Sequence, residues 1–220
     1  MTRPNEGLSG ESLPGGGFLL NVNFVFISTV LSYGLSFFAA VLMARALGDD
    51  GLGITALYRS SITLGFAFFS LGISVAVFYY IGRRDISPRD GVEAGLSITL
   101  LATALTAIGV LIAALLFNDE LTRKHVPYWL ALIGVPAAIQ FRVVESTLRA
   151  QARFGAMNLL EVSSPLAVLV ALGGVELAVG LTVERTVVAW TLALLPPVVF
   201  GYAMLGPSHW PRRLAGRALL

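Results

Sequence analysis

Long apolar runs, separated by short charged segments, restrict the folding of this chain more than any other feature. The first two runs cover residues 18–43 and 54–81. Each is longer than the ~20 apolar residues that a helix needs to cross a hydrocarbon core of ~30 Å. Charged residues make up only 13% of the chain, well below the roughly 25% of a soluble domain. We therefore expect a polytopic membrane protein.

Four more apolar runs predict further spans, over about 92–117, 126–141, 155–181 and 186–205. The expected fold is thus an all-α bundle of six transmembrane helices within residues 18–206. The polar residues 1–17, rich in glycine and proline, are interpreted as a disordered tail. Residues 207–220 carry arginines among leucines and are interpreted as a basic tail that lies on the membrane surface.

The distribution of basic residues predicts the orientation. Six spans place both termini on one side of the membrane, together with the second and fourth loops. These segments hold ten of the fifteen basic residues, namely Arg3, Arg83, Arg84, Arg89, Arg142, Arg149, Arg153, Arg212, Arg213 and Arg217. Cytoplasmic segments are enriched in Lys and Arg, so both termini are expected in the cytoplasm. The same placement beside membrane helices argues against a nucleic-acid partner, although the sequence pI is 9.2.

The segment ARALGDDGLG, residues 44–53, joins the first two spans and predicts a tight turn. Arg45 can extend to the headgroup level from the end of the first helix. Gly48 can leave that helix in a left-handed conformation, and the two acidic residues after it favour the positive end of the next helix dipole. Gly51 and Gly53 let the two helix ends approach closely.

This turn and a second segment resemble a known transporter family. An A-R-x-L-G pattern after a long first span, followed by acids and G-x-G, is similar to the polysaccharide (O-antigen type) transporter family. That family belongs to the superfamily of multidrug, oligosaccharidyl-lipid and polysaccharide exporters. The second match is LGISVAVFYYIG at residues 71–82, which contains Gly72. The resemblance covers residues 18–84, and beyond them only the spacing of spans supports it.

The resemblance implies flipping of a lipid-linked oligosaccharide across the bacterial inner membrane, for polysaccharide or lipopolysaccharide synthesis. An undecaprenyl-diphosphate sugar would move from the inner to the outer leaflet by alternating access, without a cofactor. Members of the family carry two six-helix lobes, whereas this chain supplies one. Its partners would be the bilayer, the lipid-linked glycan and a second lobe, either another copy or a separate half. A fragment or a truncated gene product is the alternative.

Other function classes stay open at this point. The chain could be a lobe of a multidrug-type exporter, or an accessory or scaffold subunit of a polysaccharide synthesis complex without translocation of its own. An enzyme is not expected, because the sequence offers no Ser/His/Asp set, metal-ligand cluster or glycine-rich phosphate loop. The absence of cysteine excludes thiolate chemistry and zinc–thiolate sites. We therefore predict neither a metal nor a cofactor.

Charged side chains inside the spans are the candidate substrate-binding residues. Arg59 lies within the second span, where it must extend to the surface, pair or face water. Arg142, Glu145 and Arg149 have spacings of three and four, which place them along one ridge of a helix with Glu145 able to bridge two arginines. Glu161 of the fifth span is expected at the same depth and close to at least one of these arginines.

Two interpretations of this ridge stay open. Arg153 continues it by four residues, so the ridge could be a solvated ladder of ion pairs on a helix that protrudes from the membrane. Alternatively, the arginines face a central cavity in the inner leaflet and bind the substrate diphosphate. Glu176, near the end of the fifth span, is expected to pair with a cation on an adjacent helix.

Small residues and prolines predict how the helices pack and bend. Small side chains recur every four residues in the first span (28–44) and in the third (91–107), and such stripes allow close packing in lipid. We expect the third span to pack against the first. Gly72 is a candidate for bending the second span. Pro196 and Pro197 should kink the sixth, because neither donates to the helical hydrogen-bond ladder.

Overall fold

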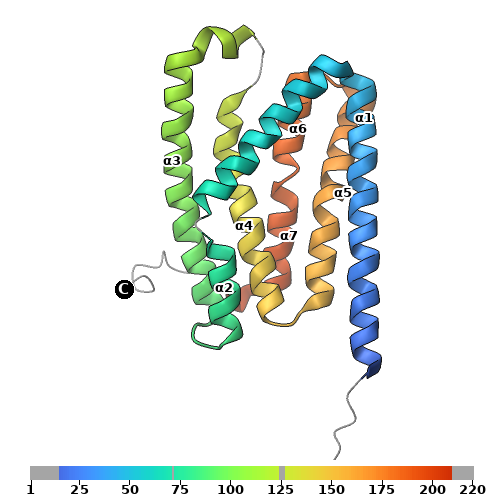
Figure 1. Cartoon of the computed structure of the whole chain (residues 1–220), viewed down its shortest axis with the longest axis vertical. Coiled ribbons are helices and arrows are strands. Elements are labelled where there is room, and N and C mark those ends of the chain that lie inside the picture. Colours follow the sequence, from blue (N-terminus) through green and yellow to red (C-terminus); the bar gives the residue numbers. More distant parts are fainter. Residues whose placement is uncertain (1–14, 71, 124–126, 210–220) are drawn as a thin grey trace, which may run out of the picture.

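The computed structural model of the chain describes residues 15–70, 72–123 and 127–209, and its regular elements are all helices (Figure 1). The predicted all-α bundle is therefore confirmed. The α-helices are α1 (Gly15–Phe69), α2 (Ile73–Gly82), α3 (Pro88–Arg123), α4 (Ala131–Ala150), α5 (Phe154–Val179), α6 (Val183–Leu192) and α7 (Leu195–Leu205). Two short 3₁₀ helices, η1 (Tyr128–Leu130) and η2 (Pro207–His209), precede α4 and follow α7.

Five helical stretches in the described residues are long and apolar enough to cross a membrane. They are Asn23–Phe69, Pro88–Leu116, Tyr128–Ala150, Phe154–Val179 and Val183–Leu205. The first contains two helices joined at a break in Gly48, so the described chain crosses the bundle six times. Successive crossings alternate in direction, which brings the start of α1 and the end of α7 to the same end of the bundle (Figure 1). The chain therefore forms a membrane-embedded helical bundle.

Gly48 makes the predicted turn between the first two crossings, but in a different backbone conformation from the left-handed one that was expected. Its φ of +65° and ψ of −173° lie in a region that is essentially restricted to glycine. A methyl group on Gly51 would lie 3.2 Å from the Val183 side chain, so this position does require close approach. The expectation for Gly53 is wrong, because the residue is exposed and a methyl group there would meet no neighbour within 4 Å. Arg45, just before the turn, is exposed.

The second and sixth crossings are each broken once, at the predicted places. Gly72, with φ of +70° and ψ of 14°, is left-handed and precedes α2. In the sixth crossing α6 ends at Leu192 and α7 begins at Leu195. Pro196 and Pro197 lie in the first turn of α7, where their missing N–H groups interrupt no helical hydrogen bond. Each of these crossings thus consists of two helices that need not be collinear.

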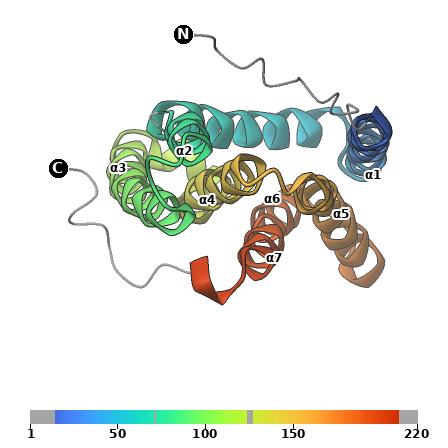
Figure 2. The same cartoon turned by 90° about the horizontal axis from the view of Figure 1, so that it is seen from below.

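α4 is the central helix and contacts each of the other six α-helices in the described residues (Figure 2). The prediction that the third span packs against the first is therefore wrong, because α3 packs mainly against α4. A methyl group on Gly95 of α3 would lie 2.5 Å from Cγ1 of Val143, so only glycine fits there. Small side chains determine how close a neighbouring helix comes, but they do not determine which helix that is.

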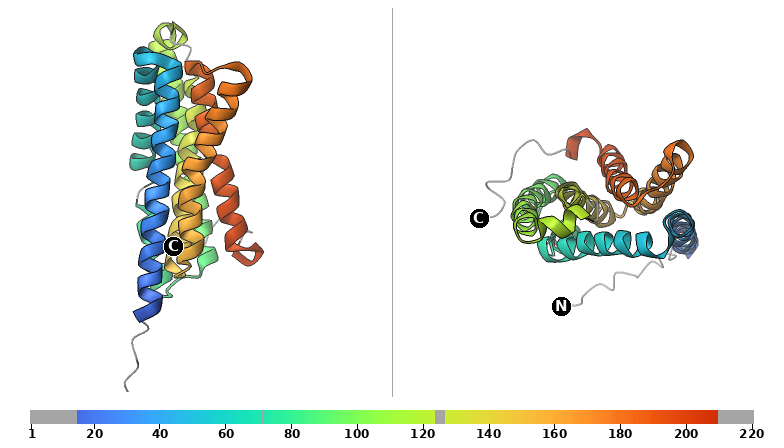
Figure 3. Two further views of the ribbon diagram at one scale, coloured as in Figure 1. Left: turned by 90° about the vertical axis from the view of Figure 1, so that its right-hand side faces the viewer. Right: turned by 90° about the horizontal axis from the view of Figure 1, so that it is seen from above.

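The predicted small-residue stripe of the first crossing is only partly buried. This crossing runs beside α5 (Figure 3), and Ser28 is buried. The later members of the stripe are exposed, namely Ser36, Ala40 and Ala44. Ala39 and Met43 take the buried positions instead and pack with Leu172 of α5. Every fourth residue of an α-helix advances about 40° beyond a full turn, so a stripe with this spacing drifts around the helix.

Two predicted boundaries differ from the structure. α1 begins at Gly15, within the segment that was predicted to be a disordered tail, and α3 continues to Arg123, past its predicted end. Local sequence determines helix ends poorly, because the last turns fray. The rest of the predicted N-terminal tail (residues 1–14), most of the basic tail (210–220) and the loop residues 124–126 lie outside the described residues.

A buried polar side chain joins three helices in the centre of the bundle. Gln140 of α4 donates through Nε2 to Thr99 Oγ1 of α3 at 2.7 Å. Its Oε1 accepts a hydrogen bond from the Tyr202 hydroxyl of α7 at 2.6 Å. Hydrogen bonds of this kind link helices within membranes, and these two fix the rotation of α4 relative to α3 and α7.

Candidate functional site

The last turns of α4 carry the predicted ridge of charges. Arg142 Nη1 donates to Glu145 Oε2 at 2.8 Å, and Arg149 Nη2 donates to Glu145 Oε1 at 2.7 Å. The prediction that Glu145 bridges two arginines is confirmed. Arg153 does not continue the ridge, because α4 ends at Ala150 and Arg153 is the N-cap residue of α5.

The three side chains differ in exposure, and this difference determines what the cluster can bind. Only 8% of the Glu145 side chain is exposed, whereas the Arg142 and Arg149 side chains are 54% and 49% exposed. One carboxylate between two guanidinium groups leaves a net charge of +1. Each guanidinium has five N–H donors. Glu145 accepts one from each, and Arg149 Nε donates a second to Met157 Sδ at 3.4 Å. The bridge therefore fixes both cations while leaving N–H edges open to an anion.

Arg142 and Phe66 line two adjoining pockets. We refer to the pocket that Arg142 and Arg149 both line as the arginine pocket, and its volume is about 320 Å³. Its lining residues are Phe66, Ser74, Val75, Phe78, Arg142, Glu145, Ser146 and Arg149. They come from α1, α2 and α4, so the pocket lies beside the break at Gly72. Both arginines of the cluster and two hydroxyl groups line the same space.

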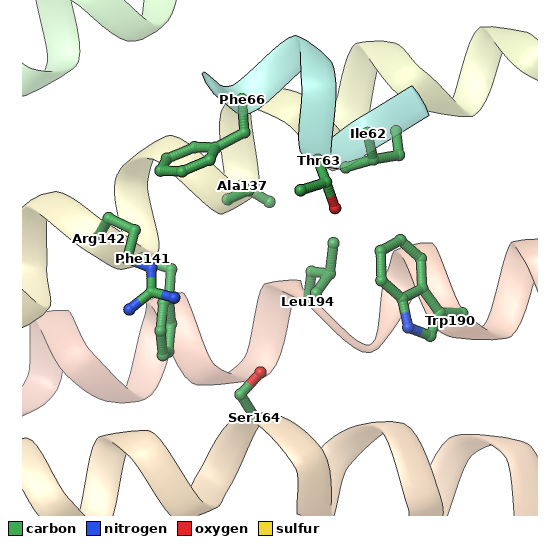
Figure 4. Close-up of a pocket in the computed structure, with 10 residues that line it drawn as sticks. Ile62, Thr63, Phe66, Ala137, Phe141, Arg142, Ser164, Trp190 and Leu194 are labelled. Atoms are coloured by element: carbon green, nitrogen blue, oxygen red, sulfur yellow. The ribbon is translucent and has the colours of Figure 1, made fainter. Parts of the chain in front are cut away.

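The second, the tryptophan pocket, has a volume of about 270 Å³. Its lining residues are Ile62, Thr63, Phe66, Ala137, Ala138, Phe141, Arg142, Ser164, Trp190 and Leu194. Figure 4 shows Arg142 at one end of this pocket and Trp190 at the other. The side chains of Thr63 and Ser164 lie between them on opposite walls (Figure 4). The pocket is thus largely apolar, with a cation at one end and hydroxyl groups along its length.

Arg59 lies next to the Trp190 end of the tryptophan pocket. Its guanidinium carbon is 5.4 Å from the centroid of the Trp190 ring, which is within cation–π range. The neighbouring Tyr58 hydroxyl is 2.9 Å from Thr191 Oγ1, so two successive residues of α1 meet two successive residues of α6. Arg59 is exposed, and its guanidinium group lies over an aromatic ring of the bundle.

The two carboxylates of α5 are not paired as predicted. Glu161 is half-buried and forms no salt bridge with any described residue. Arg142 and Arg149 both pair with Glu145, which lies on the same helix at spacings of three and four. These two arginines therefore need no carboxylate from a neighbouring helix. Glu176 accepts a hydrogen bond from the backbone N–H of Leu181 at 2.7 Å rather than from a cation. Arg185 donates instead to backbone carbonyl groups at the end of α5.

Sequence reasoning missed most residues of the tryptophan pocket, including Thr63, Phe66, Phe141, Ser164 and Trp190. They come from four crossings and gather only because α1, α4, α5 and α6 pack around one space. Apolar and hydroxyl side chains occur on every face of these spans. No local signal therefore distinguishes the ones that face the pocket.

Comparisons with family models, with curated proteins and with solved structures found no match to this chain. The chemistry of the site therefore has to follow from its geometry. Guanidinium groups present planar pairs of N–H donors that match phosphate oxygens. Two half-exposed guanidinium groups with a net positive charge, next to an apolar pocket, suit an amphiphile that has a phosphate headgroup.

Proposed function

We propose that this chain is one lobe of a transporter that moves a lipid-linked oligosaccharide across the bacterial inner membrane by alternating access. The observation that carries the proposal is the pair Arg142 and Arg149, bridged by one buried carboxylate and lining the same pocket. Ionisable groups inside a membrane bundle typically mark a substrate or ion pathway. The resemblance of residues 18–84 to polysaccharide transporters supports the same class of substrate.

The site and a diphosphate headgroup are complementary in charge and shape. The net positive charge of the cluster attracts the diphosphate, and the open N–H edges bind its oxygens. Glu145 is a positioning residue, because it fixes the direction of both guanidinium groups while it stays buried. The adjoining tryptophan pocket offers hydroxyl groups and aromatic faces to the first sugar. The apolar outer surface of the helices accommodates the prenyl chain.

A second six-helix lobe, either another copy of this chain or a separate half, would complete the transporter. A second lobe with the same orientation would be related to the first by an axis along the membrane normal. α2, which supplies three lining residues of the arginine pocket, lies toward the end of the bundle that holds the start of α1 (Figure 1). With the termini in the cytoplasm, as the basic residues predict, the substrate would load from the inner leaflet.

A reconstituted flipping assay tests this proposal. Proteoliposomes with the purified chain receive a fluorescent prenyl-diphosphate oligosaccharide in one leaflet, and its arrival in the other leaflet is measured. We expect Arg142→Gln and Arg149→Gln each to lower the rate at least about tenfold, which corresponds to roughly 1.4 kcal/mol. Arg153→Gln is the matched control, because it removes a nearby arginine that lines neither pocket.

Equal flipping by the wild type and both pocket variants would contradict the proposal. The cluster would then hold α4 together without binding substrate, which its pairing through Glu145 also permits. If instead the wild type itself does not flip the lipid, the chain is better described as a non-transporting subunit of a polysaccharide synthesis complex.

A further inference from the structure

Arg59 lies inside the second crossing and has no carboxylate partner among the described residues. It follows the turn at Gly48 by 11 residues, which is about 16 Å along a helix. None of the salt bridges in the described residues includes Arg59. An arginine at such a depth is costly unless it is paired or faces a polar path.

Three contacts of Tyr58 and Arg59 hold this part of α1 against α6. The Tyr58 hydroxyl lies 2.9 Å from Thr191 Oγ1. The Tyr58 ring packs edge-on against the Trp190 ring, with centroids 6.3 Å apart. The Arg59 guanidinium lies over the same Trp190 ring at 5.4 Å. A ring contact of this kind covers one face of a guanidinium group and leaves its N–H edges available.

The tryptophan pocket connects this contact to the arginine cluster. Trp190 lies at one end of the pocket and Arg142 at the other (Figure 4). Arg142 also lines the arginine pocket together with Arg149. Arg142 and Arg149 therefore line these adjoining pockets, whereas Arg59 lies outside them, against the Trp190 ring at the far end. None of the described residues that line the tryptophan pocket is acidic.

We propose that Arg59 and Trp190 form a second anion-binding position, which receives the phosphate-bearing headgroup of a lipid after it leaves Arg142. This position rests on the proposed function, because it lies at the far end of the tryptophan pocket from Arg142. A headgroup that moves from Arg142 to Arg59 stays near a cation, and no carboxylate in the tryptophan pocket opposes it. Trp190 holds the Arg59 side chain in place when no anion is bound.

Trp190 fluorescence reports on this position directly. With Trp129 and Trp210 replaced by phenylalanine, Trp190 is the one tryptophan left of three. The protein in lipid nanodiscs is titrated with farnesyl diphosphate, with farnesol as the uncharged probe and with inorganic pyrophosphate as the free anion. We expect a saturable change in emission with farnesyl diphosphate and none with farnesol. Pyrophosphate should need a concentration at least about tenfold higher, because it lacks the apolar chain.

Substitutions of Arg59 then test its role. Arg59→Gln should raise the half-saturating concentration of farnesyl diphosphate at least about tenfold, because the cation is lost. Arg59→Lys should give an intermediate value, because it keeps the charge but not the planar fork. Arg45→Gln is the matched control, since it removes another exposed arginine of α1 and leaves the contact between Arg59 and Trp190 intact, and it should titrate as the wild type does.

An Arg59→Gln titration equal to that of the wild type would overturn the second position, as would an equal response to farnesol. A response to pyrophosphate at the same concentration would overturn the assignment to a lipid headgroup. The flipping assay separates this inference from the proposed function. If the wild type does not flip lipid but the Trp190 response requires Arg59, the position stands and transport fails. If the wild type flips lipid and Arg59→Gln flips it equally fast, transport stands and the position fails.

Discussion

α4 and α5 are neighbouring crossings, yet they relate to their surroundings in opposite ways. In its most apolar stretch α4 has 56% of its residues buried, whereas α5 has 6%. α4 is also the least apolar of the five candidate spans in the described residues. In a soluble protein the order is reversed, because burial there follows the removal of apolar surface from water.

The difference follows from the solvent. Lipid chains are as apolar as leucine, so an apolar helix surface gains little by being covered. A polar group that faces hydrocarbon, by contrast, loses its hydrogen-bond partners. α4 carries Gln140 and Glu145, and both find partners only inside the bundle or on their own helix. Polarity, rather than apolar character, therefore marks the interior helix. We expect substitutions around α4 to lower the free energy of unfolding more than substitutions on α5.

The largest expected effect is at the closest contact with α4. Gly95→Leu should lower the free energy of unfolding by about 3 kcal/mol, at the upper end of overpacking effects, because even a methyl group would lie 2.5 Å from Val143. Gly174→Leu on α5 is the matched change, since a methyl group there would meet no neighbour within 4 Å. Thermal unfolding of the purified variants measures both. Equal melting temperatures would mean that the α3–α4 contact is not close-packed.

The next effect concerns the two carboxylates. Glu145→Gln should cost about 2 kcal/mol, which is less than for a fully buried pair because both arginines are half-exposed. Glu161→Gln should change stability by less than about 0.5 kcal/mol, since Glu161 has no salt bridge among the described residues. Denaturant titration compares the two variants. A larger loss for Glu161→Gln would show that α5 carries the more important charge.

The smallest effect is expected at the central hydrogen bonds. Gln140→Leu removes one bond to α3 and one to α7 and should cost about 1 kcal/mol, because interhelical hydrogen bonds in membranes are individually weak. Ser163→Ala on α5 removes only a bond to the backbone of its own helix and should be nearly neutral. The same denaturant series measures both variants. If Gln140→Leu left the free energy of unfolding unchanged, the two hydrogen bonds would not contribute to stability, and packing alone would hold α4 in place.

The sequence predicts much of this fold because most of its signals are local. Long apolar runs predict the crossings, and the exceptional backbone at Gly48 and Gly72 falls on residues that tolerate positive φ. The pairing of helices was not predictable, as the error about α3 shows. With nearly every face apolar, amphipathicity does not point to a partner, and a spacing of four residues drifts away from the buried row within a few turns.

In the candidate site, too, contacts within one helix were predictable from the sequence, whereas contacts between helices were not. Arg142, Glu145 and Arg149 were predictable, because spacings of three and four on one helix bring side chains together whatever the surroundings are. The failure of Glu161 to pair shows the limit, since its position relative to α4 depends on the rotation and tilt of two helices. The contact between Arg59 and Trp190 joins residues that are far apart in the sequence, and no local pattern connects them.

The break at Gly72 determines how mechanical load passes through the bundle. A continuous helix resists bending because backbone hydrogen bonds tie each turn to the next. Between Phe69 and Ile73 this regular pattern is interrupted, and the Ile73 N–H donates to the Ser70 carbonyl instead. The second crossing therefore consists of two short helices joined at a hinge. One carries Arg59, and the other carries Ser74 of the arginine pocket. A force on one of these helices is transmitted to the other mainly through α4, which both helices contact. The mechanical connection between the two parts of the second crossing is thus provided mainly by α4 and not by the second crossing itself.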